Sequence, residues 1–75
     1  MRQYTILLTP DLEEGGYVVD VPVLPGCHTQ GDTPEEAIAN AREAIAAWIK
    51  SADKDGEPVP EEQAHTQALV IEVAA

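Results

Sequence analysis

The sequence predicts an α+β domain in which a four-stranded mixed sheet is covered on one face by one helix, in the order βββαβ. Three observations carry this prediction. Three short alternating segments occupy the first 31 residues, one long helical periodicity follows, and a last alternating segment comes after residue 67. Strands joined by short connections form an antiparallel meander, and a helix with one apolar stripe has to bury that stripe against the sheet.

The first three strands are predicted from a period of two in the side chains. Residues 4–9 alternate in this way, and residues 16–21 do so again until Pro22 ends the segment. Residues 27–30 form the third and shortest strand. Because the connections between these segments are short, neighbouring strands are expected to run antiparallel.

One helix and one further strand complete the prediction. The helix is expected from Pro34 to about residue 52, because apolar residues recur there at three- and four-residue steps: Ile38, Ala41, Ile45, Trp48, Ile49 and Ala52. A polar loop at 53–65 leads to a last strand at 68–73. Since this strand returns after the helix, it is expected to run parallel to the strand before it.

Residues 24–37 contain a turn, the third strand, a second turn and the start of the helix in succession. Pro25-Gly26 suits a tight turn, and Gly31 begins a second one. Thr33 can cap the helix with its hydroxyl, and Glu36, three residues later, completes a capping box. The sequence therefore predicts a well-defined strand-to-helix junction.

Residues 15–37 resemble the signature of the HicB-like antitoxin family, the UPF0150 group. The signature reads roughly G-G-Y-x-V-x-x-P-x-L-P-G-C-x-[ST]-x-G-[DE]-T-x-E-E-A. Its defining positions in this chain are Gly16, Tyr17, Pro22, Pro25, Gly26, Cys27, Gly31, Thr33 and Glu36. The resemblance implies that residues 1–75 are a single HicB-like domain with a reduced RNase H-like sheet and one helix.

Length and charge restrict the classes of function. A 75-residue chain has a marginal core, and its single cysteine provides no disulfide, so a homo-oligomer, a dimer or tetramer, is expected. Fourteen acidic and four basic residues give a net charge of −10, which disfavours direct nucleic-acid binding. With no secretory signal or membrane-length apolar run, a cytoplasmic location and no membrane partner are expected.

The sequence predicts no enzymatic activity, no metal and no cofactor. A two-metal nuclease needs converging carboxylates, and residues 4–9 contain none. The other candidate carboxylates stand on separate elements: Asp20, Glu43 and Glu72. Cys27 and His28 are neighbours on a strand and point to opposite faces, so they do not form a nucleophile–base pair. No Cys/His cluster has the spacing of a zinc site.

One helix covers only one face of such a sheet, and the other face is a mixture of apolar and polar residues. This mixture indicates a contact surface for a partner or a second copy. The alternative is that β-branched residues there merely favour strands and that the face is open to water. The candidate interface residues are Thr5, Leu7, Val18, Asp20, His28, Val70 and Glu72.

The resemblance implies that the chain is an antitoxin of a toxin–antitoxin pair, whose partner would be a HicA-like toxin, a small basic RNA-cleaving protein. An acidic domain can cover a basic RNA-binding surface. Many family members carry a C-terminal DNA-binding segment, which is not expected here because Ala75 directly follows the last strand. The alternative is a stand-alone homo-oligomeric module that binds another protein or a small ligand.

Overall fold

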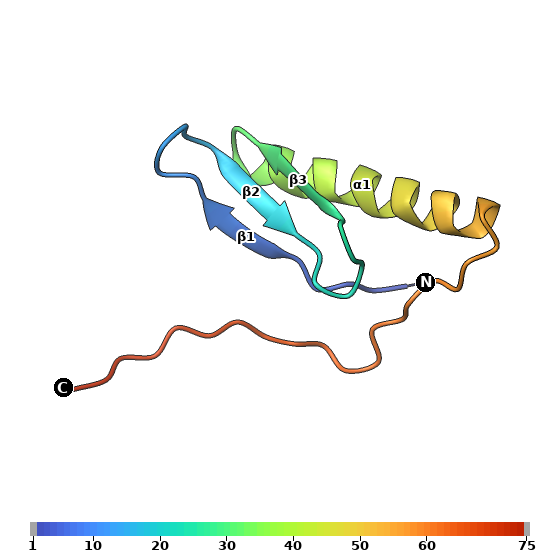
Figure 1. The fold of residues 1–75 in the computed structure, drawn as a ribbon. Helices are drawn as coiled ribbons and strands as arrows, with labels where there is room; N and C mark the ends of the chain where they lie inside the picture. Colours follow the sequence, from blue (N-terminus) through green and yellow to red (C-terminus); the bar gives the residue numbers. More distant parts are fainter. Residues whose placement is uncertain (1, 75) are drawn as a thin grey trace.

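The computed structural model describes residues 2–74 and shows an α+β fold, a three-stranded sheet with one helix lying across one of its faces (Figure 1). Strand β1 spans Leu7–Pro10, β2 spans Tyr17–Asp20 and β3 spans His28–Gly31, and helix α1 spans Pro34–Lys54. The strands form an antiparallel meander in the order β1-β2-β3. The α+β class, the three-strand meander and the single helix are thus confirmed.

The centre of the core lies between β2 and the first half of α1. Leu8, Val19 and Thr29 are in register across the three strands. Val19 is fully buried against Ala37 and Ala41 of α1. Because alanine side chains are small, the helix can approach the sheet closely, and Val19 fills the space between them.

A second core cluster is formed by the connection between β2 and β3. Val21, Leu24 and Cys27 are buried there, and Trp48 of α1 packs against them. The Trp48 indole N–H donates a hydrogen bond to the carbonyl oxygen of Pro25 at 2.9 Å, which fixes the Pro-Gly turn to the helix. Burial raises the pKa of the Cys27 thiol, so this side chain serves as a small apolar core residue.

The start of α1 is capped as predicted, with one difference. The Thr33 hydroxyl oxygen accepts a hydrogen bond from the backbone N–H of Glu36 at 3.1 Å. The Glu36 carboxylate accepts one at 3.2 Å from the N–H of Asp32, whereas a capping box would use the N–H of Thr33 itself. The Glu36 carboxylate therefore bonds the backbone N–H of Asp32, the residue before the cap.

The Thr33→Ala variant is expected to lose about 1 kcal/mol of unfolding free energy, because the Glu36 N–H loses its side-chain acceptor. Thr33→Ser keeps the hydroxyl and is the matched control. Urea denaturation of the three proteins measures the difference. An unfolding midpoint of Thr33→Ala equal to that of the wild type would show that the cap contributes nothing.

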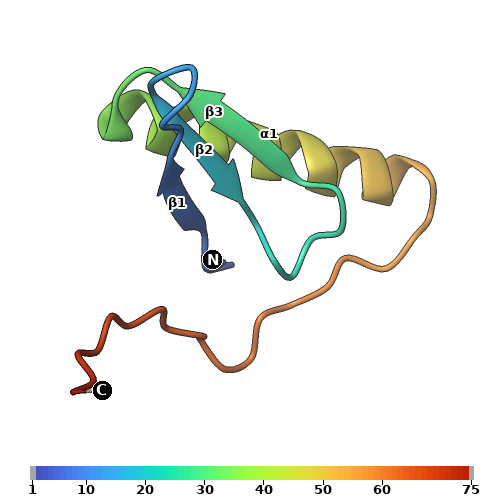
Figure 2. The same cartoon turned by 60° about the vertical axis from the view of Figure 1, so that its left-hand side comes forward.

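The predicted fourth strand at 68–73 is not confirmed, because the structure shows no strand in that segment. The C-terminal tail, residues 57–74, contains neither helix nor strand; it passes the N-terminal end and then runs beneath the sheet without joining it (Figures 1 and 2). Val70 is fully exposed, and Leu69 and Ile71 are 77% and 76% exposed. The observed sheet is therefore wholly antiparallel. Alternation reveals a segment suited to a sheet, but it does not say which edge will pair with it.

Candidate partner-binding face and the anchor of the tail

The sheet face opposite the helix carries one continuous row of the predicted interface residues. Strand register places Leu7, Asp20 and His28 side by side across β1, β2 and β3. Their side chains point away from α1, because successive residues of a strand alternate and Val19 faces the helix. Leu7 is 36% exposed, and Asp20 and His28 are also exposed. The row is therefore accessible to a partner.

A second row lies beside the first one. Thr9, Val18 and Gln30 are in register, and Val18 is the half-buried apolar residue at its centre. Thr9 and Gln30 were not among the candidate interface residues, although their two-residue spacings from Leu7 and His28 were a signal for them. We call these two rows the open face: Leu7, Thr9, Val18, Asp20, His28 and Gln30. The open face thus combines two apolar side chains with several hydrogen-bonding groups and one carboxylate. This composition is typical of a protein-contact surface.

The other three predicted interface residues do not lie on the open face. Thr5 precedes β1 and is hydrogen-bonded to the tail. Val70 and Glu72 lie on the exposed part of the tail. The assignment of Val70 and Glu72 to this face depended on a fourth strand at 68–73, which the structure does not show.

The tail is anchored to the N-terminal segment by Glu62, a contact that the sequence did not predict. The Glu62 carboxylate accepts hydrogen bonds from the backbone N–H of Thr5 at 2.7 Å and from the Thr5 hydroxyl. It also lies 2.9 Å from Nδ1 of His65, and its side chain is 3% exposed. The Tyr4 hydroxyl donates a hydrogen bond to the carbonyl oxygen of Pro60 at 2.7 Å. These bonds hold residues 60–65 beside the start of the chain.

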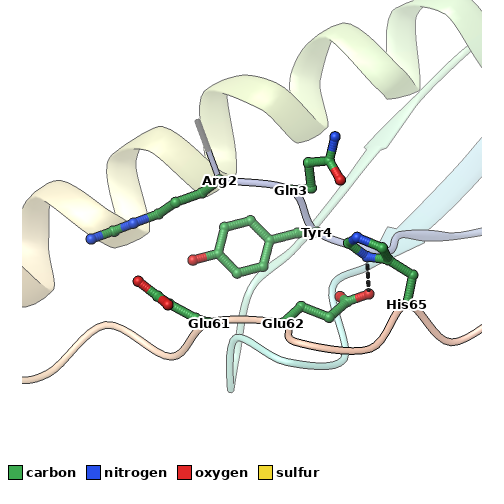
Figure 3. A pocket seen from close by; sticks show the side chains of 6 residues that line it. All are labelled: Arg2, Gln3, Tyr4, Glu61, Glu62 and His65. Atoms are coloured by element: carbon green, nitrogen blue, oxygen red, sulfur yellow. Dashed lines mark hydrogen bonds and ion pairs between the residues drawn. The ribbon is translucent and has the colours of Figure 1, made fainter.

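Figure 3 shows the polar hollow around this anchor, lined by Arg2, Gln3, Tyr4, Glu61, Glu62 and His65. The hydrogen bonds from the Thr5 hydroxyl and N–H lower the pKa of Glu62 to about 2. A carboxyl with so low a pKa stays ionised near neutral pH, which suits a clamp and not a general acid. Within residues 2–74, no group of three His, Cys, Asp or Glu side chains is placed to hold a metal ion.

Acid is expected to release the tail anchor. The pKa of Glu62 is about 2 in the folded protein, below its ordinary 4.5, so the anchor contributes fully above about pH 4.5. This contribution is lost as the pH falls from there towards 2. The protection factor of the Thr5 amide, which is its exchange rate relative to the intrinsic rate at the same pH, should therefore fall over that range.

The Glu62→Gln variant should show faster exchange at Thr5 already at neutral pH, because an amide is a weaker acceptor than a carboxylate. Glu61→Gln removes the same charge from the neighbouring exposed residue and is the control. Equal protection of Thr5 in the wild type and in Glu62→Gln would contradict the anchoring role of the carboxylate.

Within residues 2–74, no helix is both long enough and apolar enough to span a membrane. The carboxylates considered for a nuclease lie on three different parts of the chain. Asp20 is on the open face, Glu43 is on α1 and Glu72 is on the tail. The described structure therefore does not bring these three carboxylates together.

Comparisons with known proteins agree with the signature in residues 15–37. A family model described as the HicB-like antitoxin of bacterial toxin–antitoxin systems matches residues 4–72, which include both the open face and most of the tail. A UPF0150 protein of Thermoplasma acidophilum is 52% identical over 62 residues, 83% of this chain and 88% of that protein. A UPF0150 protein of Synechocystis is 49% identical over 68 residues, 91% of this chain and 85% of that protein.

One relative has a name that states a role. The protein named antitoxin HicB 1 of Photorhabdus laumondii is 41% identical to this chain over 58 residues. These residues are 77% of this chain but 37% of that protein. The similarity is therefore to one part of a longer antitoxin.

Proposed function

The chain belongs to the HicB-like antitoxin family, and from this premise we propose that it binds and neutralises a small, basic, mRNA-cleaving toxin of the HicA type. The family match over residues 4–72 is the observation that carries the proposal. The net charge of −10 supports it, because an acidic protein attracts a basic RNA-binding surface and repels RNA itself. The proposed role is stoichiometric binding in the cytoplasm, without catalysis and without direct contact to nucleic acid.

The open face is the proposed contact surface for the toxin. Val18 offers apolar area at its centre and Leu7 at its β1 edge, and Asp20 offers a carboxylate to a lysine or arginine of the partner. His28 is in register with Asp20 and extends the polar rim across β3. We also propose that the complete domain has the four-stranded, RNase H-like sheet of its family, with a strand added beside β1.

Co-expression in bacteria tests the proposed function. A HicA-type toxin encoded beside the gene should stop growth when expressed alone, and co-expression of this chain should restore growth. Leu7→Asp places a charge on the apolar β1 side of the open face and should abolish the rescue. Leu12→Asp makes the same change at a 94% exposed position in the β1–β2 turn and should retain it.

The purified proteins provide the decisive control. If the chain does not bind the toxin in a pull-down at low salt, the antitoxin proposal is wrong for this pair. If binding persists in Leu7→Asp, the antitoxin role stands and the contact surface lies elsewhere.

A further inference from the structure

We propose that a groove at the C-terminal end of α1 receives an arginine side chain of a basic protein partner. The groove is separate from the open face, since none of the six open-face residues lines it. The inference rests on the proposed function for the identity of the partner, a HicA-type toxin, and it adds a second contact to the proposed complex.

Three segments of the chain form this groove, which has a volume of about 540 Å³. The last turns of α1 contribute Trp48 and Ala52, and the connection between β2 and β3 contributes Pro25. The start of the tail, which leaves the end of α1 here (Figure 1), contributes Pro58 and Pro60. The lining is therefore largely apolar. Ligand sites in proteins typically have volumes of roughly 300–1,000 Å³, so the groove has room for a long side chain.

Hydrogen bonds hold these three segments in place. The Trp48 indole N–H bonds the Pro25 carbonyl oxygen at 2.9 Å, which fixes the β2–β3 connection to α1. The backbone N–H of Glu57 donates a hydrogen bond to the Ala52 carbonyl oxygen at 2.9 Å, which fixes the start of the tail to the end of α1. The bond from the N-terminal segment to the Pro60 carbonyl oxygen holds the far end of this stretch. A groove that is formed before binding loses little conformational entropy when a partner enters.

The charges around the groove favour a cation. Asp55 and Glu57 line it, and none of its lining residues is a lysine or an arginine; Lys54 of the last turn is not among them. Both carboxylates are exposed, and within residues 2–74 neither of them forms an ion pair. The carbonyl groups at the C-terminal end of a 21-residue helix add partial negative charge. An apolar groove with such a rim is suited to a side chain with an apolar stem and a cationic head.

Arginine fits this combination better than lysine. Its planar guanidinium group stacks on aromatic rings and offers five N–H donors, enough to reach two carboxylates at once. Trp48 is half-buried, and because its N–H is already bonded, the rest of its ring is left for apolar contact in the groove. A lysine ammonium group is more strongly hydrated and loses more when it leaves water.

One partner can contact the groove and the open face together. Asp20 ends β2 and His28 begins β3, so the connection that contributes Pro25 starts and ends at this end of the open face. A basic protein bound to Asp20 would therefore meet a second acidic site, at Asp55 and Glu57, beyond the same end of the sheet.

Tryptophan fluorescence tests the groove directly, because Trp48 is the only tryptophan of the chain. A capped Gly-Arg-Gly peptide at millimolar concentration and low salt should change the emission of the wild type saturably. The same peptide with neutral citrulline in place of arginine should not. The double variant Asp55→Asn/Glu57→Gln should bind the arginine peptide roughly tenfold more weakly. Glu13→Gln/Glu14→Gln removes the same charge from the exposed β1–β2 turn and should bind it like the wild type.

Three results of this titration would overturn the proposal. They are the absence of a saturable change, equal binding of the citrulline peptide, and equal binding by Asp55→Asn/Glu57→Gln and the wild type. A Gly-Lys-Gly peptide that binds as tightly as the arginine peptide would overturn the assignment of arginine.

The dissociation rate of the toxin, measured by surface plasmon resonance, links the groove to the proposed function. Asp55→Asn/Glu57→Gln should release the toxin roughly tenfold faster than the wild type does, and Glu13→Gln/Glu14→Gln at the wild-type rate. If the wild type binds the toxin and both double variants release it at the wild-type rate, this inference is wrong and the antitoxin role stands. If the wild type does not bind the toxin at all, the proposed function fails and this inference fails with it.

Discussion

The Gly31→Ala variant is expected to lose about 3 kcal/mol of unfolding free energy, a large fraction of the stability of so small a domain. Gly31 ends β3 directly against the first turn of α1. A Cβ atom at this position would lie 2.7 Å from the Cα atom of Ala37 and closer still to its backbone nitrogen. Both atoms belong to a helix whose start is fixed by Thr33, so neither can move unless the helix moves.

The cost is large because a displaced helix loses its contact with β2. Ala37 and Ala41 bury Val19, and this cluster is the centre of the core. For a domain of this size, about 3 kcal/mol corresponds to a fall in melting temperature of roughly 12–24 °C.

Gly15→Ala is the matched control, since a Cβ atom at Gly15 meets nothing within 4 Å. Gly15 has a φ of 81°, so alanine there costs about 1–2 kcal/mol of backbone strain alone. Thermal unfolding followed by circular dichroism compares the two variants. For Gly31→Ala, a fall in melting temperature of less than about 5 °C corresponds to roughly 1 kcal/mol or less. Such a small fall would show that α1 can move away from β3 at little cost in stability.

Local sequence signals predicted most of the fold. The first two strands followed from side-chain alternation, the third from the turns on either side of it, and the helix from its apolar stripe and from the cap at Thr33. The row of Leu7, Asp20 and His28 also followed, because alternation and short connections fix which residues share a face. These features depend on neighbours that are close in the chain, and such information is present in a single sequence.

The tail could not be predicted in the same way. The bond between Thr5 and Glu62 joins residues 57 positions apart, and nothing near Glu62 marks it as an acceptor for that backbone. The polar composition of 53–65 indicated a loop; the helix in fact continues to Lys54, and the rest of that segment contains no helix or strand. The alternation of 68–73 indicates a segment suited to a strand, but it does not identify the strand that would pair with it. The expected position of Val70 and Glu72 depended on that pairing.

The role of Gly31 was predicted only in part. Its place before Asp32 indicated a turn, where glycine is common. The structure shows a different reason for glycine at this position, namely the close approach of α1 to β3. Such an approach between two elements cannot be read from the residues of either element alone.

Association with the proposed toxin is expected to slow at least tenfold as ionic strength rises from about 0.01 to about 0.15 M. Over this range the Debye length falls from roughly 30 Å to roughly 8 Å, so the attraction between a chain of charge −10 and a basic partner is screened before contact. The dissociation rate should change much less, because it depends mainly on contacts at short range. Surface plasmon resonance at four or more salt concentrations measures both rates.

Two variants that each remove one negative charge distinguish long-range attraction of the toxin from direct contact with it. Asp20→Asn lies on the open face, and Asp53→Asn lies on the exposed surface near the end of α1. Both should lower the association rate slightly and to a similar extent, since long-range attraction depends on total charge. Only Asp20→Asn should accelerate dissociation, by roughly tenfold, if its carboxylate pairs with a cation of the toxin. Equal dissociation rates in the two variants would remove Asp20 from the interface, and an association rate independent of salt would exclude steering by charge.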